Sequence, residues 1–325
     1  MTPPSLPPEL KAALDARLQG LSRHKAAARA AAISKTYRDG GGSGTIRTEP
    51  DALAYALARM PATYAAITAS LNALREIRPG FAPESLLDVG AGPGTASWAA
   101  AEAFASLKTL TLIDANEALR ALALDLERGS TRLSELTYKK GEARAALSEA
   151  GPADLVIASY MIGELADSER RPLAEAMWAR TRDTLVIVEP GTPAGYARVI
   201  AAREQLIGRG AHVAAPCPHE KNCPLVSPDW CHFSQRLPRS QAHKQIKGAE
   251  LAFEDEKFSY VVLSRAPVAT RPARVLAQPV VTKVEVTAKL CTEDGLAIAR
   301  VPRRDKTAYA RARRWRWGDA VMEES

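Results

Sequence analysis

The residues best suited to chemistry form a glycine-rich run after a short apolar stretch. Ser85–Val89 leads directly into Asp88-Val-Gly90-Ala-Gly92-Pro-Gly94-Thr95. A strand, a glycine-rich turn and a helix in this order bring backbone N–H groups close to a nucleotide-like ligand. Asp114 follows 20 residues after Gly94, at the end of the next apolar stretch. A carboxylate at that position can accept hydrogen bonds from both hydroxyls of a ribose.

The spacing of the glycines separates three interpretations. Dinucleotide-binding enzymes favour G-x-G-x-x-G, whose third glycine allows a helix to pack closely beside a pyrophosphate. This chain has D-x-G-x-G-x-G, which resembles motif I of class I S-adenosylmethionine methyltransferases. We favour S-adenosylmethionine over a dinucleotide and over a purely structural glycine turn. The resemblance implies a set of cofactor-binding residues: Asp88, Gly90, Ala91, Gly92, Gly94, Thr95, Asp114, Glu142, Ala143 and Ser159.

No catalytic residue is predicted. The segment expected to face the methyl group is Ser159-Tyr-Met-Ile-Gly-Glu-Leu165. It is not the [ND]-P-P-[YFW] signature of many enzymes that methylate exocyclic amines, and it lacks the cysteine nucleophile of cytosine-C5 methyltransferases. Glu164 is a possible base or substrate ligand, although a capping or surface role is more common. Methyl transfer from an activated sulfonium requires little beyond proximity.

The four cysteines all lie in the last third of the chain, and three of them fall within 15 residues. A chain without an export signal is expected to keep its thiols reduced, so a disulfide framework is not expected. These cysteines stand beside prolines, histidines and charged residues, which predicts a shared metal site. The expected ligands are Cys217, Cys223, Cys231 and Cys291.

Two metal groups suit four cysteines. Structural zinc usually takes C-x2-4-C pairs, and the intervals here are longer. An iron–sulfur cluster accepts four cysteines from a wide loop, so we favour a cluster, with Zn²⁺ and structural thiols as alternatives. The neighbouring histidines are expected to support the site without acting as ligands.

Short apolar stretches alternate with alanine-rich helical patterns from residue 84 onward. The predicted strands are Ser85–Val89, Leu110–Asp114, Leu136–Tyr138, Asp154–Ala158 and Thr184–Glu189. This alternation predicts an α/β fold with a parallel sheet covered on both faces. It is the Rossmann-like sheet that the class I methyltransferase resemblance implies.

The flanking segments have different patterns. Residues 6–21 and 22–35 are predicted to be helical, and a helix over residues 50–78 is predicted to be interrupted at Met60-Pro61. Residues 210–256 predict an inserted, loop-rich module. Beyond it, Phe258–Ser264 predicts a strand, and Glu293-Asp294-Gly295 predicts the turn of a β-hairpin.

The composition excludes several classes of protein. With 325 residues, 46% hydrophobic and 25% charged, the chain is expected to form one large domain with appendages, or two domains. No apolar stretch reaches the roughly 18–20 residues that span a bilayer, and the first residues do not resemble a secretion signal. We therefore expect no membrane partner and a cytoplasmic protein or, in a eukaryote, a protein of the mitochondrial matrix.

The net charge of +7 is concentrated near the C-terminus. Arg300 to Trp317 holds eight Lys and Arg and one Asp, which leaves 36 of 44 basic and 36 of 37 acidic residues elsewhere. Such a segment favours a polyanion, and a solvated tail that aids solubility is the alternative. The interleaved Tyr309, Trp315 and Trp317 are able to stack on bases, and the alternative is that the tryptophans pack on the domain and the arginines are solvated. The expected RNA-binding residues are Arg303, Arg304, Arg311, Arg313, Arg314 and Arg316.

Together these features resemble the methyltransferase-like small-ribosomal-subunit assembly factor family of bacteria and mitochondria. The matching segments are Arg59-Met-Pro-Ala-Thr-Tyr64, Asp88-Val-Gly-Ala-Gly-Pro-Gly94, Glu189-Pro-Gly-Thr192, Ala215-Pro-Cys-Pro-His219, Asp229-Trp-Cys-His-Phe-Ser-Gln-Arg236, Glu254-Asp-Glu-Lys-Phe-Ser-Tyr260, Leu290-Cys-Thr292 and Arg316-Trp-Gly-Asp319. The resemblance implies that the four cysteines hold a [4Fe–4S] cluster. It also implies that the partners are the small-subunit rRNA and the pre-ribosomal small subunit.

Four regions are expected: a helical region (1–80), a cofactor-binding core (81–209), a cysteine-rich insertion (210–257), and the last core strands with the hairpin and basic tail (258–325). The first functional hypothesis is a methyltransferase for small-subunit rRNA. The second is a non-catalytic assembly factor that uses the fold as a scaffold. A small-molecule methyltransferase is a third. No feature predicts a particular oligomeric state.

Overall fold

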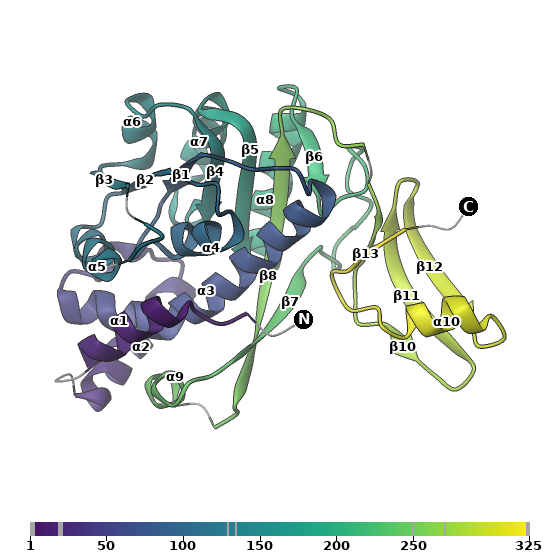
Figure 1. Ribbon diagram of the computed structural model, residues 1–325, viewed down its shortest axis with the longest axis horizontal. Coiled ribbons are helices and arrows are strands. Elements are labelled where there is room, and N and C mark those ends of the chain that lie inside the picture. Colours follow the sequence, from purple (N-terminus) through teal and green to yellow (C-terminus); the bar gives the residue numbers. More distant parts are fainter. Residues whose placement is uncertain are drawn as a thin grey trace.

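A computed structural model describes residues 4–18, 22–128, 130–133, 135–248, 250–269 and 271–322, without the side chain of residue 242. The chain forms a large layered body and a smaller C-terminal unit beside it (Figure 1). No helix among the described residues is long and apolar enough to cross a membrane.

The body is built on one mixed sheet, whose strands are β1 (Ser85–Val89), β2 (Thr109–Asp114), β3 (Leu136–Lys140), β4 (Ala153–Ser159), β5 (Thr181–Pro190), β6 (His212–Ala215), β7 (Phe233–Pro238) and β8 (Phe253–Ser264). Their order is β3-β2-β1-β4-β5-β8-β6, and β7 pairs with β8. β1 to β5 are parallel, whereas β8 runs antiparallel to β5 and β6. The five strands predicted up to residue 189 and the class I methyltransferase arrangement are confirmed.

Alternate residues of the strands enter two separate cores. In β4, Leu155 and Ile157 belong to one core, and Val156 and Ala158 belong to the other. Helices α4 (Thr95–Ala103) and α5 (Glu117–Glu127) contribute to the first, and α6 (Ala143–Ser148), α7 (Asp167–Ala179) and α8 (Pro193–Ile207) contribute to the second. The sheet is therefore buried on both faces, which explains the continuous apolar runs of its strands.

Three N-terminal helices pack on the first core: α1 (Pro8–Leu18), α2 (Arg23–Arg38) and α3 (Glu49–Ile77). The short helix η1 (Ser43–Thr45) lies between α2 and α3. Residues 19–21 of the first predicted helix lie outside the described residues. The predicted interruption at Pro61 is wrong, because α3 continues through it. A proline costs about 3 kcal/mol in a helix interior. The burial of Met60, Ala62, Tyr64 and Ile67 around it offsets that cost.

The expected loop-rich insertion is only partly irregular. It contains β6, β7 and the helix α9 (Gln241–Lys247), and β6 is an integral strand of the main sheet. The buried side chains of Val213, Ala214 and Ala215 explain this pairing, since they fill the two cores. Residues 216–232, which carry three of the cysteines, form no helix or strand.

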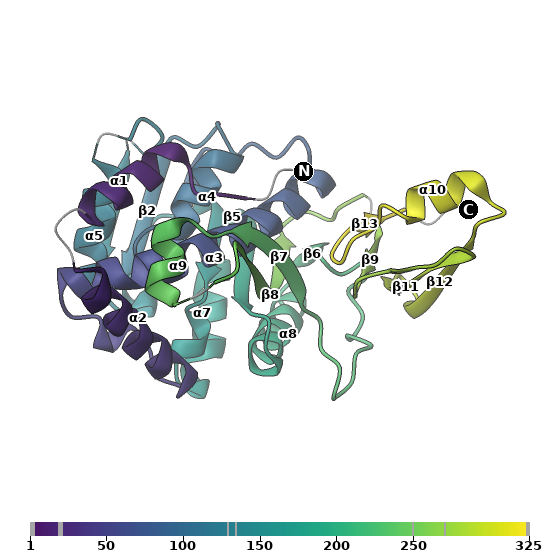
Figure 2. The same cartoon turned by 90° about the horizontal axis from the view of Figure 1, so that it is seen from below.

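The C-terminal unit is a small antiparallel sheet with one helix. It contains β9 (Ala273–Val275), β10 (Val280–Val281), β11 (Glu285–Thr292), β12 (Gly295–Pro302), α10 (Lys306–Ala312) and β13 (Ala320–Val321). β11 and β12 form the predicted hairpin, and α10 lies along one face of it (Figure 2).

Candidate functional site

The glycine-rich run opens onto the larger of two cavities that concern function. This cavity has a volume of about 560 Å³ and lies at the carboxyl ends of β1, β2 and β4. That location, beside the point where the strand order reverses between β1 and β4, is where open α/β sheets bind ligands. Eight of the predicted cofactor-binding residues line it: Gly90, Ala91, Gly92, Thr95, Asp114, Glu142, Ala143 and Ser159.

Asp114 joins the second strand to the glycine loop. Its Oδ2 accepts a hydrogen bond from the backbone N–H of Gly92 at 2.8 Å, and its Oδ1 accepts one from the N–H of Asn116 at 2.7 Å. Burial raises the pKa of Asp114 above its ordinary value. Gly90 has a φ of 70°, and a Cβ on it would lie 2.6 Å from the Cβ of Met161, so this turn requires glycine.

Asp88 and Gly94 are not part of the cavity lining. Asp88 is fully buried, and its Oδ2 accepts hydrogen bonds from the N–H and Oγ of Ser97 in α4. Its Oδ1 has no partner among the described residues, and burial raises the pKa of this carboxyl to about 7. Gly94 caps α4 with a left-handed backbone. Both residues therefore support the glycine-rich loop without lining the cavity.

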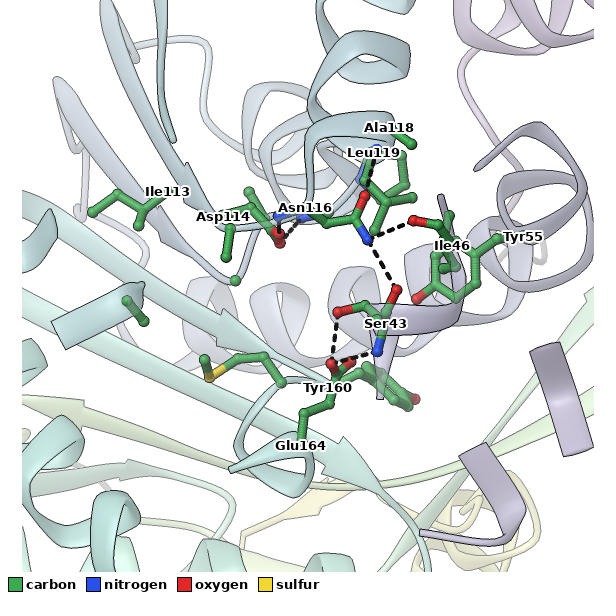
Figure 3. A pocket seen from close by; sticks show the side chains of 18 of the residues that line it. Ser43, Ile46, Tyr55, Ile113, Asp114, Asn116, Ala118, Leu119, Tyr160 and Glu164 are labelled. Atoms are coloured by element: carbon green, nitrogen blue, oxygen red, sulfur yellow. Dashed lines mark hydrogen bonds between the residues drawn. The ribbon is translucent and has the colours of Figure 1, made fainter. Parts of the chain in front are cut away.

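A segment that the sequence did not point to covers the cavity. Ser43 and Ile46 line it, together with Tyr55 of α3 (Figure 3). Tyr37 also lines it. The side-chain amide of Asn116 donates to the carbonyl oxygens of Ser43 and Ile46, both at 2.9 Å. No local sequence pattern marked this segment as part of the site.

Glu164 holds the opposite side of the same segment. One of its carboxylate oxygens accepts hydrogen bonds from the N–H and Oγ of Ser43, both at 2.8 Å (Figure 3). The other oxygen accepts one from the Tyr37 hydroxyl at 3.0 Å. Residues 37–46 are therefore joined to the loops after both β2 and β4. Glu164 acts here as an acceptor for the covering segment.

The loop after β4 is held in a strained conformation. Among the described residues other than glycine, only Tyr160 has a positive φ, at 57°. Its hydroxyl donates to Glu256 at 3.0 Å. The buried Glu189 accepts from the N–H of Ile162 at 3.1 Å and from Arg198 of α8 at 2.7 Å. These contacts from β5, β8 and α8 fix the backbone beside the expected methyl position.

The four cysteines line one second cavity, although Cys291 lies far from the others in the chain. This cavity has a volume of about 20 Å³ and is also lined by α8 and β8. Burial, and then the neighbouring thiols, raise the pKa of Cys217 and Cys231, and burial raises the pKa of Cys291 to about 12. In the described part of the chain, no three His, Cys, Asp or Glu side chains already have the arrangement of metal ligands.

The charges around this second cavity suit an anion. Arg203 and Arg274 line it and are only 1% and 2% exposed. Both guanidinium groups donate to backbone carbonyl oxygens, those of His219, Lys221, Pro216 and Gly318. Two nitrogens of Arg203 have no partner among the described residues. Buried cations require compensation, and four metal-bound thiolates would supply negative charge there.

The basic tail presents its arginines to solvent, while its aromatic rings are buried or half-buried. All six predicted RNA-binding arginines are exposed. Tyr309 is buried and donates to the carbonyl oxygen of Thr282 at 2.6 Å. Trp317 donates to the carbonyl oxygen of His232 at 2.8 Å, and Trp315 packs on the hairpin. The rings help to hold the tail on the protein, and burial removes Tyr309 from the rings that could stack on bases, whereas Trp315 and Trp317 are half-buried.

Comparison with known sequences agrees with this arrangement. The profile of the family described as "Mitochondrial small ribosomal subunit Rsm22" matches residues 49–322. The human mitochondrial protein named "Ribosome assembly protein METTL17" is 31% identical over 296 residues, which cover 84% of this chain and 63% of that protein. The Rsm22-cox11 tandem protein 2 of Schizosaccharomyces pombe is 25% identical over 334 residues, 84% of this chain and 43% of that protein. The chain thus spans less than two thirds of these relatives.

Solved structures with a similar fold are distant. Magnesium protoporphyrin IX methyltransferase from Synechocystis, solved with bound S-adenosylhomocysteine, has a TM-score of 0.42 and 11% identity over 71% of this chain and 93% of its own. Precorrin-6y C5,15-methyltransferase from Geobacter metallireducens has a TM-score of 0.40 and 15% identity over 59% and 86%. The fold assignment therefore rests on the strand order, and the match over residues 49–322 shows that the chain belongs to the Rsm22 family.

Proposed function

We propose that this protein binds S-adenosylmethionine in the 560 Å³ cavity and acts on the small ribosomal subunit and its rRNA. The observation that carries the cofactor assignment is the hydrogen bond between Asp114 and the N–H of Gly92. This bond holds the glycine loop against the end of β2. The ribose and the amino-acid end of one ligand could therefore both bind there.

Each part of the ligand has candidate partners in the cavity. Asp114 would accept the ribose hydroxyls, and the backbone of Gly90 to Gly92 would surround the amino-acid end, with Asp88 behind it. Glu142 and Ala143 would lie beside the adenine, and Ser159 towards the sulfonium. The bound ligand supplies an activated methyl group, and the protein orients it and excludes water.

The ribosomal role is supported by the relatives and by the charge of the tail. The human relative is named as a ribosome assembly protein of mitochondria. The six exposed arginines of the tail suit the phosphates of rRNA. We infer a place in the mitochondrial matrix if the source is eukaryotic and in the cytoplasm if it is bacterial.

A second candidate function is assembly without methyl transfer. It is favoured by the internal pairing of the polar groups beside the expected methyl position. Glu164 is hydrogen-bonded to Tyr37 and Ser43, and Tyr160 is hydrogen-bonded to Glu256. In this interpretation the fold is a scaffold that presents the tail to rRNA.

We also propose that Cys217, Cys223, Cys231 and Cys291 hold a [4Fe–4S] cluster, with Zn²⁺ as the alternative. The support is their common cavity and the two buried guanidinium groups beside it. A bound group would join residues 216–232 to β11, and hence the main body to the C-terminal unit. We infer that residues 1–80 cover the cofactor and that residues 81–209 bind it. Residues 210–257 would hold the metal group, and residues 258–325 would contact RNA.

The test uses cells in which the gene is deleted and replaced by wild type or by Asp114→Ala. Small-subunit levels are measured on sucrose gradients, and rRNA methylation by mass spectrometry. Loss of both a specific methyl group and mature subunits with Asp114→Ala supports the methyltransferase. Normal subunits with Asp114→Ala, together with their loss in the deletion, support the scaffold. Normal subunits in the deletion strain contradict the proposal.

A further inference from the structure

The C-terminal unit exposes an unusual share of aliphatic side chains. Nine large hydrophobic side chains are strongly exposed among the described residues, and five of them lie between residues 280 and 298: Val280, Val281, Val284, Leu296 and Ile298. Ile298 is 57% exposed and Leu296 is 44% exposed. Apolar groups gathered on one surface usually mark a site of interaction.

Three of these side chains lie on the same face of the sheet. In the antiparallel register, Leu296 is opposite Cys291 and Ile298 is opposite Lys289. Val280 is opposite Thr287, which is in turn opposite Arg300. Because paired residues point to the same side and alternate along a strand, Val280, Leu296, Ile298 and Arg300 share one face.

The outer edge of β12 is open. Among the described residues, β12 pairs only with β11, along all eight of its residues. The N–H of Arg303 donates to the carbonyl oxygen of Val284 at 2.7 Å. This bond shows which residue pairs of β11 and β12 are hydrogen-bonded to each other and which are not, because the two kinds alternate along the strands. Residues 297, 299 and 301 therefore bond to β11. Leu296, Ile298 and Arg300 direct their backbone N–H and C=O groups outward.

The opposite face of the hairpin is already covered. α10 packs there through Tyr309 and Ala312 on Val286. The exposed Arg313 and Arg314 follow this helix. The unit thus has an arginine-rich side over α10 and a separate side on which aliphatic side chains meet an unpaired strand edge.

We propose that the outer edge of β12 binds an extended segment of a protein partner, in which aliphatic side chains alternate and carboxylates flank them. Such a segment would add a strand to the sheet and cover Leu296 and Ile298. The charge of this unit favours an acidic protein segment over a second copy of this chain, because residues 274–322 hold eleven Lys and Arg against five Asp and Glu. A second copy of this chain would bring the same positive charge, and RNA offers neither a strand backbone nor aliphatic side chains. The inference rests on the proposed function in that the partner is a protein of the small subunit.

The test uses the full chain, loaded with its metal group, and small ribosomal subunits purified from the source organism. Ile298→Pro removes an outward N–H that bonds to nothing in the described part of the chain, so the hairpin is expected to persist. Ile298→Val keeps the N–H and an aliphatic side chain and is the matched control. Ala299→Pro removes a donor to β11 and shows what a disrupted hairpin looks like by circular dichroism.

We expect Ile298→Pro to bind subunits at least about tenfold more weakly, with unchanged circular dichroism and unchanged affinity for an rRNA fragment, and Ile298→Val to match wild type. A photo-crosslinker, Leu296→benzoylphenylalanine, is expected to label one ribosomal protein. Equal binding by Ile298→Pro and wild type, or a crosslink to RNA or to a second copy of the chain, overturns the inference alone. Absence of wild-type binding to subunits overturns the proposed function and, with it, this inference.

Discussion

The sulfur of Cys291 lies 3.6 Å from Nε2 of His219, although 72 residues separate them. This contact brings β11 of the C-terminal unit against the irregular segment that carries the other three cysteines. His219 is buried, and its Nδ1 has no partner among the residues described. A buried imidazole thus lies beside Cys291, which suits a thiolate that is bound to a metal and accepts a hydrogen bond.

The first prediction concerns this cysteine. Cys291→Ser is expected to lower the bound iron, or zinc, by at least half and to lower the melting temperature, because metal binding is coupled to folding. Metal analysis and visible absorbance of protein purified without oxygen measure the first effect. Leu225→Val is the control, since Leu225 lines the same cavity without a sulfur. Full metal content in Cys291→Ser would exclude Cys291 as a ligand.

The convergence of the cysteines was predictable from the sequence only in part. The clustering of three cysteines among prolines and histidines indicated a site, and the family resemblance added Cys291. The two buried arginines beside it were not predictable, because Arg203 lies in a helix pattern and Arg274 in a short strand with no local signal. Their burial results from tertiary packing between α8, the cysteine segment and β9.

The second prediction concerns pH and Asp88. Its folded-state pKa is about 7, above the ordinary 3.8. Between these values the folded protein keeps a proton that the unfolded chain has lost, so stability falls as the pH rises through this window. Asp88→Asn removes that dependence.

The melting temperature of Asp88→Asn relative to wild type is expected to rise by about 2–6 °C between pH 5 and pH 8.5. Thermal melts without cofactor measure this difference. Asp167→Asn, at an exposed carboxylate of α7, is the control and should follow wild type at both pH values. An unchanged gap between Asp88→Asn and wild type from pH 5 to 8.5 would show that Asp88 ionises normally.

The third prediction concerns the covering segment. Glu164→Ala removes the acceptor for Tyr37 and Ser43, so amide hydrogen exchange over residues 37–47 is expected to rise about tenfold. Glu169→Ala, at the start of α7, is the comparison because that carboxylate does not touch the segment in the described structure. Equal exchange in Glu164→Ala and wild type would mean that the segment is held by its other contacts.

The covering segment could not be predicted from local sequence patterns. The strands, the glycine loop and Asp114 follow from patterns of two to about twenty residues. The contacts of Ser43 with Asn116 and Glu164 join positions 73 and 121 residues apart. Pro61 is a similar case, because burial along α3 outweighs the local preference to end a helix there.

The fourth prediction concerns the tail. Replacing Arg304, Arg313 and Arg314 by alanine is expected to weaken binding to rRNA. It is also expected to reduce the slope of the logarithm of the binding constant against the logarithm of the salt concentration, by about one for each phosphate that the tail no longer binds. Filter binding at several salt concentrations measures both quantities. The control replaces Lys11, Lys35 and Lys108, which are exposed on the main body. Equal losses of affinity in the two triple variants would indicate a general charge effect.

The most direct test of the account is titration calorimetry of S-adenosylmethionine into the full, metal-loaded chain. We predict one binding site, weakened at least about tenfold in Asp114→Asn, which keeps an acceptor for Gly92 but loses the charge, and about a hundredfold in Asp114→Ala. Glu117→Gln, at the exposed rim of the same cavity, should bind nearly as well as wild type. No binding by the wild-type chain, or equal binding by Asp114→Ala, would contradict the account.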